Sequence, residues 1–428
     1  MKVFIETYGC RMNICDSEIL LSILAAKGYN QSGRMEDADV IILNCCSVRE
    51  IGHEKTFSRL EQIAEKELQS RTIVICGCFA TQLDKTLFDK YPFVDIIIGP
   101  DQYRALPDLI FDKKSHVVLN GSCLDEMYAD IVPLRTIEDK TTAAITIMKG
   151  CNQYCSYCIE PYTRGKEHSR DMKSILQECR NIADQGYREL TFVGHIIDRY
   201  AYGFADLLER TSVLCPELRI KFLSSHPVTF SDDILHVMKR HDNIMHVVHL
   251  PVQSGSNSVL RRMHRGYTVE QYRERYKIVK HEIPDISIVT DIMVGFCGET
   301  EEDFQQTLSL IQELRFDDIN VFRFSMRNGT AASRQFRDDV PESVKDERYK
   351  AIIEARDAIK EPAYKADIGR TIPVIVEGRW PADRSFLFGR DHRLRTILFK
   401  SEDNLPINAD AQVLINEVTP SVLIGSVV

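Results

Sequence analysis

The chain has 428 residues, of which 44% are hydrophobic and 27% charged, and a formal net charge of −9. This length predicts two or three domains, and the composition is that of an ordinary globular protein, which excludes a disordered or fibrous chain. The negative charge excludes a globally basic nucleic-acid binder but is compatible with a local basic patch.

Two features of the sequence predict the compartment. Residues 1–6 enter a strand-like pattern at once, and we expect neither a secretory signal nor a membrane span. The thirteen cysteines then indicate a reducing environment, in which cysteines serve as ligands or core residues and not as disulfides. We therefore expect a cytoplasmic protein that has no contact with a membrane.

Residues 1–118 alternate short apolar runs with amphipathic stretches. Strands are expected at residues 2–7, 40–43, 73–76 and 94–98, and helices at 17–27 and 54–68. This pattern predicts a small open α/β sheet, on which ligands bind beyond the carboxyl ends of the strands. Cys10, Cys46 and Cys78 each follow one of these strands. Their convergence at one edge would supply three ligands for a second metal cluster.

Other cysteines of this segment have plainer interpretations. Cys45 adjoins Cys46, so position alone leaves the choice between these two ligands open. Cys76 would face the core of its strand, and Cys15 is typical of a buried small hydrophobe. Residues 119–140 are polar and irregular, and we interpret them as a connector.

Three cysteines form the most distinctive motif of the sequence. Cys151, Cys155 and Cys158 follow the apolar run 143–148 with the spacing Cys-x₃-Cys-x₂-Cys. An odd number of thiols cannot pair completely, whereas three thiolates on a four-iron cluster leave one iron open for a small chelating molecule. Zinc would need a fourth Cys or His nearby, and after Cys158 the next one is His168, ten residues on. Three unrelated core cysteines are the remaining alternative.

Residues 141–361 alternate strands and helices again. Strands are expected at 143–148, 190–194, 219–224, 246–250, 287–296 and 320–325, and helices at 174–185, 205–214, 232–240, 269–283 and 301–314. About six βα units predict a parallel, barrel-like sheet, although a full eight-fold barrel would give a similar pattern.

Polar groups at the predicted strand ends could bind a nucleoside or an amino acid moiety. Gln253, Ser254 and Asp291 can form hydrogen bonds with ribose or with a charged amino acid group. Helix capping is the alternative interpretation for Ser254, as it is for Glu299 and Thr300.

The last segment predicts a small β-barrel. A helix is expected at 342–360, and β-like runs at 371–378, 393–399, 411–418 and 421–425 favour an OB-like barrel. Residues 379–400 hold six basic and two acidic residues with interleaved aromatic residues, which suits RNA backbone contact and base stacking. The basic residues are Arg379, Arg384, Arg390, Arg393, Arg395 and Lys400, and a solvated loop is the alternative.

These motifs together resemble one family. The spacing of Cys151, Cys155 and Cys158 resembles the signature of the radical S-adenosylmethionine (SAM) enzymes. The stretch Pro161-Tyr162-Thr163-Arg164-Gly165 is similar to the methylthiotransferases, most of all to the MiaB type that modifies tRNA. The segments Glu6-Thr-Tyr8-Gly9-Cys10, Asn44-Cys45-Cys46-Ser47-Val48-Arg49-Glu50 and Gly77-Cys78 resemble the ligand motifs of their N-terminal domain. The register of the second segment favours Cys46 over Cys45.

The resemblance implies three domains and two cofactor sites. The domains are a methylthiotransferase N-terminal domain at 1–118, a radical SAM core with a partial (β/α)₆ barrel at 137–363, and a TRAM domain at 365–428. Two 4Fe–4S clusters are implied, an auxiliary one on Cys10, Cys46 and Cys78 and a catalytic one on Cys151, Cys155 and Cys158. SAM would be held by Gln253, Ser254, Asp291 and Arg164.

The implied function is transfer of a methylthio group to C2 of an N6-prenylated adenosine beside the anticodon of tRNA. No side-chain base could deprotonate this aromatic carbon, so cofactor chemistry is needed. The implied partners are the tRNA anticodon stem-loop and an electron donor such as flavodoxin or ferredoxin, and a monomer is expected.

Three alternatives remain at this point, together with departures from the family pattern, of which one bears on the substrate. A threonylcarbamoyl-adenosine methylthiotransferase belongs to the same class, and the RimO type that modifies a ribosomal protein resembles the chain less. A catalytically inactive iron–sulfur protein that binds RNA is a different class, which SAM turnover would exclude. His195-Ile196 stands where the MiaB type usually has Gln-Asn, so the acceptor nucleoside is uncertain.

Overall fold

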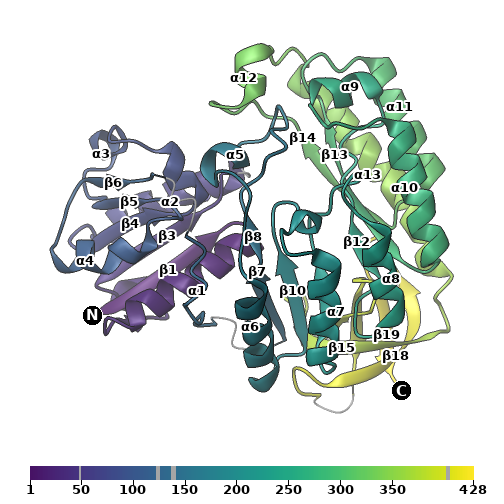
Figure 1. Cartoon of the computed structure of the whole chain (residues 1–428), viewed down its shortest axis with the longest axis horizontal. Coiled ribbons are helices and arrows are strands. Elements are labelled where there is room, and N and C mark those ends of the chain that lie inside the picture. The colour runs from purple at the N-terminus through teal and green to yellow at the C-terminus, as the bar shows by residue number, and fades with distance from the viewer. Residues whose placement is uncertain (48–49, 122–125, 136–140, 402–404) are drawn as a thin grey trace.

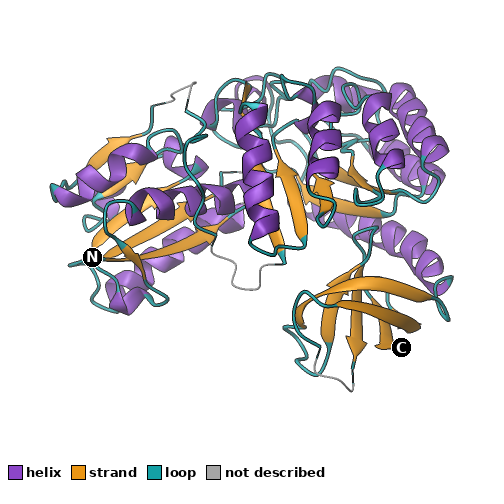
Figure 2. Ribbon diagram, turned by 60° about the horizontal axis from the view of Figure 1, so that its bottom comes forward, coloured by secondary structure: helices purple, strands orange, loops and turns teal. Residues whose placement is uncertain are grey.

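The structure is a computed structural model that describes residues 1–47, 50–121, 126–135, 141–401 and 405–428. The elements are arranged in three groups (Figure 1). An N-terminal sheet lies beside a central set of strands and helices, and a barrel of strands follows at the carboxyl end (Figure 2). This arrangement confirms the fold class expected from the sequence.

The N-terminal sheet is parallel and is covered on both faces. Its strands are β1 (Lys2–Tyr8), β2 (Asn30–Gln31), β3 (Val40–Cys45), β4 (Thr72–Cys76), β5 (Ile96–Ile98) and β6 (Val117–Leu119), in the order β2-β1-β3-β4-β5-β6. Val40 and Ile42 pack toward α1 (Arg11–Ala25) and α4 (Leu106–Phe111), whereas Ile41 and Leu43 pack toward α2 (Glu50–Glu65). This two-sided burial explains the continuous apolar runs.

The boundaries differ from the expected ones where polar groups contribute to an element. Helix α1 begins at Arg11 instead of residue 17, because Cys10 and the Asn13 side chain form a capping box at its start. Strands β2 and β6 are too short to give an alternating pattern, so they were not expected.

Six parallel strands form the central part, in two groups of three. One group has the order β11-β10-β7 and the other β12-β13-β14, and a bridge between Ile220 and Ile244 links them. The strands are β7 (Thr142–Thr146), β10 (Glu189–Val193), β11 (Arg219–Phe222), β12 (Val247–His249), β13 (Ser287–Val294) and β14 (Asp318–Arg323). Within the described residues β7 and β14 are the outer strands, so the barrel is partial and not eight-fold.

Helices cover the outside of these central strands. They are α6 (Met172–Asp184), α7 (Phe204–Leu214), α8 (Asp232–Arg240), α10 (Val269–Glu282) and α11 (Glu301–Leu314). The long helix α13 (Glu342–Lys365) packs against β14 and leads into the last group of strands. No helix in the described part of the chain combines the length and the apolarity that a membrane crossing requires.

The last group closes into a barrel with the order β15-β16-β17-β19-β18. Its strands are β15 (Thr371–Arg379), β16 (Leu387–Arg390), β17 (Thr396–Lys400), β18 (Asp410–Val418) and β19 (Leu423–Val427). Strand β16 was not expected, because its four residues include a glycine and an arginine and give no β-like run.

The barrel packs against the amino ends of the central strands. Arg219, the first residue of β11, donates from Nη1 to the carbonyl oxygen of Arg390 over 2.8 Å. Arg188, just before β10, pairs with Asp410 at 2.9 Å. The ring of His246, before β12, meets that of His392 at a centroid distance of 4.7 Å. The barrel therefore lies at the end of the central strands opposite to their carboxyl ends.

The predicted basic run is divided by this packing. Arg393 pairs with Asp317 at 2.6 Å, at the start of β14. Arg390 pairs with Glu377, and Arg395 with Asp367 and Asp391. These three arginines hold the barrel together or attach it to the central strands, whereas the side chains of Arg379, Arg384 and Lys400 are exposed. The expectation of one basic surface was therefore wrong for half of the run.

Gly150, which precedes the first cysteine of the signature, can be tested by substitution. Its φ is +72°, and a Cβ there would lie 1.9 Å from the carbonyl oxygen of Lys166. Gly150→Ala should lower the free energy of unfolding by at least about 3 kcal/mol. The alanine would hold a strained positive φ, and the backbone at Lys166 would also have to move away from the new Cβ. Gly186→Ala is the matched control, since its φ is +83° with open space around the Cβ; it should cost about 1 kcal/mol. Equal shifts in denaturant unfolding would contradict this account.

Candidate active site with two cysteine sets

The signature cysteines lie in one loop between β8 (Met148–Lys149) and α5 (Glu160–Thr163). Cys151 and Cys155 are buried and Cys158 is half-buried. Burial raises the pKa of the Cys151 thiol to about 11, and the charge of Cys155 adds to this effect. The pKa of Cys158 is raised well above its usual value by burial and by Cys155. The structure thus brings the three thiols close enough to influence one another.

Two arginines that the sequence did not single out hold this loop. Arg265 is buried and donates from Nη1 to Sγ of Cys155 over 3.3 Å, and from Nη2 to the carbonyl oxygen of Pro251 over 3.3 Å. Ser156 donates its hydroxyl to the carbonyl oxygen of Arg262 over 2.7 Å. Neither arginine belongs to a motif, and both are more than a hundred residues away in sequence, so only the fold shows their role.

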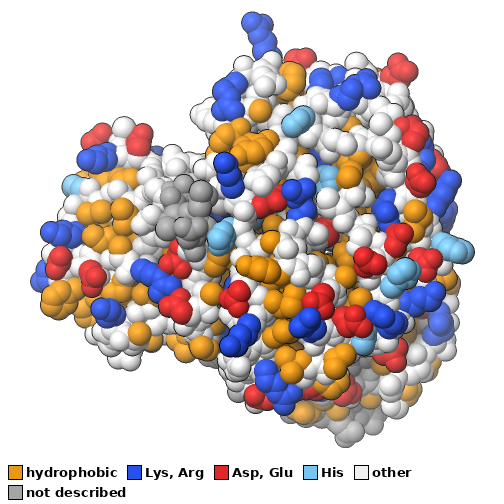
Figure 3. Space-filling view, viewed as in Figure 1, with side chains coloured by type: hydrophobic (Ala, Val, Ile, Leu, Met, Phe, Trp, Pro, Cys, Tyr) orange, Lys and Arg blue, Asp and Glu red, His pale blue; other side chains and the backbone are white. Residues whose placement is uncertain are grey.

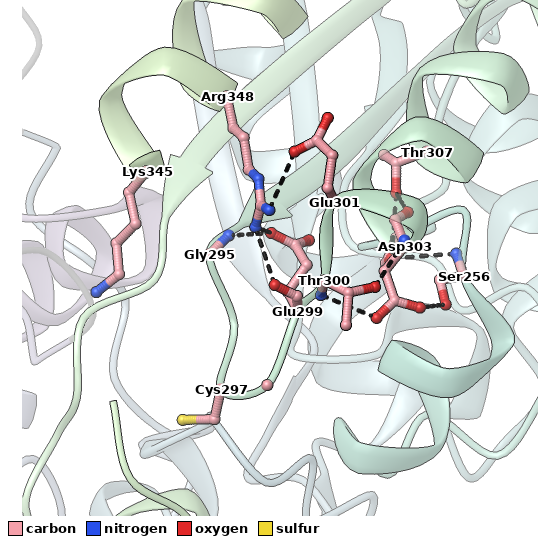
Figure 4. Close-up of polar contacts among 12 residues, drawn as sticks. Ser256, Gly295, Cys297, Glu299, Thr300, Glu301, Asp303, Thr307, Lys345 and Arg348 are labelled. Carbon is pink, nitrogen blue, oxygen red and sulfur yellow. Dashed lines mark hydrogen bonds and ion pairs between the residues drawn. The ribbon is translucent and has the colours of Figure 1, made fainter. Parts of the chain in front are cut away.

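The loop after β13 supports Arg262 in turn. Arg262 donates to the carbonyl oxygens of Cys297 and Gly298 over 3.0 and 2.9 Å. At the other end of this turn, the Glu299 carboxylate accepts from the Gly295 backbone and from Arg348, which also pairs with Glu301 (Figure 4). The turn therefore has a rigid support on α13 and α11.

The caps of α11 and α9 (Asn257–Arg262) complete this support. Thr300 caps α11 through a capping box with Asp303, as the capping interpretation expected, and Asp303 also accepts from the Ser256 hydroxyl (Figure 4). Ser256 itself caps α9. Glu299, by contrast, serves as the partner of Arg348.

The N-terminal cysteines lie at the carboxyl edge of their sheet, where the sequence placed them. Cys10 follows β1, Cys46 follows β3, and Cys78 begins the short helix η2 (Cys78–Gln82) after β4. A hydrogen bond with Cys46 lowers the pKa of Cys10 to about 6 against the effect of burial. Burial raises the pKa of Cys78 to about 12, and the charge of Cys10 contributes to this shift. The three thiols therefore lie in one neighbourhood.

The neighbouring cysteines lie elsewhere. The Cys45 thiol is buried against the Thr56 hydroxyl, with 2.7 Å between Sγ and Oγ1. Cys76 is buried in the core beneath α1, and Cys15 donates to the carbonyl oxygen of Ala144 over 3.6 Å. Val48 and Arg49 of the second ligand motif lie outside the described residues.

Arg164 connects the two cysteine sets. Its backbone follows α5, six positions after Cys158, and its Nε donates to Sγ of Cys78 over 2.9 Å. Its other nitrogens pair with Asp16, and the side chain is only 4% exposed. The structure thus places Arg164, predicted to bind SAM, against an N-terminal cysteine.

A cavity of about 750 Å³ opens beside the signature loop. Cys158, Glu160, Gln253 and Asp291 line it. The His249 Nε2 atom and the Asp291 Oδ1 atom are 2.8 Å apart, and Asn320 donates to the same oxygen over 2.9 Å. Two of the predicted SAM contacts, Gln253 and Asp291, therefore face one cavity.

Ser254 lies behind this cavity wall. It is fully buried, its hydroxyl accepts from the Ser256 backbone over 3.2 Å, and it lies 3.3 Å from the Thr307 hydroxyl. Gln253 itself has a φ of +71°. Its backbone bonds to Asp291 on one side and to Met293 on the other, over 2.8 and 2.9 Å. Ser254 therefore supports the strained backbone of Gln253.

Glu160 marks the place where the two sets and the cavity meet. Its charge contributes to the pKa of Cys10, Cys78 and Cys158. His195, the residue that departs from the family pattern, holds the Glu160 carboxylate with 2.9 Å between Nε2 and Oε2. Burial opposes ionisation of Glu160, but His195, Arg164 and Arg327 outweigh it, so its pKa lies below the usual value. A carboxylate is thus fixed between the two sets.

The donor sets suit iron–sulfur clusters better than a single ion. Among the described residues, no group of three His, Cys, Asp or Glu side chains converges tightly enough to hold one metal ion. A cubane cluster instead takes one thiolate per iron, so its cysteines surround a wider core. Three cysteines gathered in each set, one of them beside a buried arginine, fit this requirement.

Comparisons with known proteins agree with this geometry. Residues 2–99 match the uncharacterized protein family UPF0004, and residues 145–311 match the radical SAM superfamily. The radical SAM methyltransferase TsrM from Kitasatospora setae is similar in structure, with a TM-score of 0.57, 14% identity and coverage of 75% of this chain and 72% of that protein. This similarity shows the fold alone.

Sequence relatives extend over the whole chain. The tRNA-2-methylthio-N(6)-dimethylallyladenosine synthase of Azobacteroides pseudotrichonymphae genomovar. CFP2 is 41% identical over 434 residues, which cover 99% of this chain and 96% of the relative. The synthase of the same name from Porphyromonas gingivalis (strain ATCC BAA-308 / W83) is 38% identical over 444 residues, with coverages of 100% and 95%. The chain therefore belongs to the family of the tRNA-2-methylthio-N(6)-dimethylallyladenosine synthases.

Proposed function

We propose that the chain transfers a methylthio group to C2 of an N6-prenylated adenosine beside the anticodon of tRNA. The observation that carries this proposal is the contact between the two cysteine sets: Arg164, six positions after Cys158, donates to Sγ of Cys78 over 2.9 Å, beside a cavity that Cys158 and Glu160 line. The full-length relatives named for this reaction favour it over the threonylcarbamoyl-adenosine alternative and over an inactive RNA-binding protein.

The cysteines would be the cofactor ligands. Cys151, Cys155 and Cys158 would hold the catalytic 4Fe–4S cluster, and Cys10, Cys46 and Cys78 the auxiliary one. When bound, the clusters and SAM supply the electron, the radical chemistry and the sulfur. The chain supplies the geometry: Gln253 and Asp291 orient SAM in the cavity, and Arg265 and Arg164 fix one thiol of each set.

The wider assignments follow from this proposal. The domains would be residues 1–118, 137–363 and 365–428, and the last would be a TRAM domain that contacts RNA; residue 137 lies outside the described residues. A cytoplasmic monomer would receive electrons from a flavodoxin or a ferredoxin. The closed barrel and the exposed Arg384 and Lys400 support the RNA contact.

Single cysteine variants test the division of labour between the two sets. Cys10→Ala should abolish methylthiolation of the RNA but leave SAM cleavage measurable, whereas Cys158→Ala should abolish both. Mass spectrometry of the digested RNA and of 5′-deoxyadenosine measures the two reactions. Cys46→Ala should behave like Cys10→Ala. Cys45→Ala is its matched control and should keep both reactions, because the Cys45 thiol contacts Thr56 in the core. Loss of SAM cleavage in Cys10→Ala would argue against two separate tasks.

Substitutions of two neighbouring residues, Gln253 and Ser254, should distinguish SAM binding from structural support of the cavity wall. Gln253→Ala should weaken SAM binding about tenfold, which is about 1.4 kcal/mol, because it removes a side chain from the cavity. Ser254→Ala should leave SAM affinity nearly unchanged but cost about 1 to 2 kcal/mol of stability, since it removes buried hydrogen bonds. Calorimetric titration and thermal unfolding measure the two effects. The reverse pattern would place Ser254 in contact with SAM.

The exposed end of the basic run can be tested by salt dependence. The double variant Arg384→Ala/Lys400→Ala should weaken binding of an anticodon stem-loop. Its slope of log K against log salt should decrease by about 0.7 to 0.9 for each phosphate that the barrel no longer neutralises. Lys113→Ala/Lys114→Ala is the matched control, because both lysines are exposed on the N-terminal sheet domain. Equal slopes in the two double variants would remove the barrel from the RNA interface.

A further inference from the structure

The contact between Arg164 and Cys78 is a charge-assisted one in a buried place. The distance from Nε to Sγ is 2.9 Å, the two other nitrogens of the guanidinium pair with Asp16, and Arg164 is 4% exposed. A guanidinium stays charged and presents its donors in a fixed fork. With Asp16 occupying one side of the fork, the remaining donor is directed at the sulfur.

This contact joins two parts of the chain that are far apart in sequence. Arg164 follows Cys158 by six positions, and its backbone N–H bonds to the carbonyl oxygen of Glu160 over 2.8 Å, so it is anchored to α5. Helix α5 packs against η2, which begins with Cys78. The guanidinium therefore transmits the position of the signature loop directly to one N-terminal thiol.

We propose that Arg164 is a positioning residue of the auxiliary cluster that raises its reduction potential through Cys78. The inference rests on the proposed function, in which Cys10, Cys46 and Cys78 hold that cluster. Hydrogen bonds to the sulfurs and nearby charge are determinants of cluster potential, and a positive donor stabilises the more negative, reduced state. Among the described residues, Cys10 has no such charged donor: its thiol itself donates, to Asn13 Oδ1 over 3.4 Å.

The signature set offers a parallel within the same chain. Arg265, also buried, donates to Cys155 over 3.3 Å. Arg265 contacts its own loop and the neighbouring strand end, whereas Arg164 reaches across to the N-terminal sheet. Each set thus has one cysteine that accepts a hydrogen bond from a buried arginine, and in the N-terminal set this arginine comes from the segment after the signature cysteines.

A purely structural role is the competing explanation, in which Arg164 only attaches the two parts of the chain through Asp16. Arg170 provides the matched control for this possibility. It is 7% exposed and pairs with Glu178, which also pairs with Arg135 in the same region. The side-chain hydrogen bonds of Arg170 go to Glu178 and Ser174 and not to a cysteine.

The experiment uses the full chain with the variant Cys151→Ala/Cys155→Ala/Cys158→Ala as background, so that only the N-terminal set can bind a cluster. Arg164→Lys, Arg164→Gln and Arg170→Lys are each added, and the proteins are reconstituted without oxygen. Iron content, Mössbauer spectra and an EPR-monitored redox titration are then measured. Arg164→Lys keeps the charge but not the fork, and Arg164→Gln removes the charge as well.

Both Arg164 variants should reduce less readily than the background, with a reduction equilibrium constant lower by about tenfold, which is about 59 mV for a one-electron couple. Arg170→Lys should match the background. Failure of both Arg164 variants to bind iron, with Arg170→Lys loaded, would favour the purely structural role and overturn the inference. Equal reduction potentials in all proteins that bind iron would refute the role of Arg164 but leave the proposed function standing. A background that binds no iron would refute the auxiliary cluster, and the inference with it.

Discussion

Buried charges fix the N-terminal sheet against the central strands, and both cysteine sets depend on this junction. Arg135 of the connector pairs with Glu18 of α1 at 2.7 Å and also with Glu178 of α6, and Lys149 pairs with Asp101 at 2.6 Å; every one of these side chains is less than a tenth exposed. Apolar surfaces can slide against each other, whereas a buried ion that loses its partner costs about 3 to 5 kcal/mol. Such pairs therefore permit one relative position of the two parts, which is what two adjacent reaction centres require.

The direction of the strands determines where the cysteines of each set come together. In both sheets the cysteines follow the carboxyl ends of parallel strands, and a parallel sheet collects all such ends at one edge. The two edges meet at α5, which follows the signature cysteines and packs on η2. The short segment from Cys158 to Arg164 therefore contains a predicted cluster ligand, the carboxylate beside His195, and the arginine that meets the other set.

The sequence predicted the local parts of this site and not its long-range supports. The six cysteines stand out because strand ends and close spacing are visible along the chain. Arg265, Asp16 and Arg262 act on residues about a hundred or more positions away, so nothing near them in sequence reports their role. The basic run of the last barrel shows the converse: composition identifies six basic residues, but only packing reveals that Arg390, Arg393 and Arg395 are already paired. Strand β16 was missed for a related reason, since its pairing partners define it more than its residues do.

Helix α13 sets the distance between the turn beside the signature loop and the C-terminal barrel. Its 24 residues form a continuous rod that begins near the turn below the signature loop and ends at the barrel on the opposite side of the central strands. A helix of 24 residues is about 36 Å long at a rise of about 1.5 Å per residue. A free nucleoside can occupy only one end, whereas a folded RNA that contacts both binds its second site at a high effective concentration, because a helix is a stiff spacer. Under the proposed function, two weak contacts at the ends of this rigid helix would thus select structured RNA by its length.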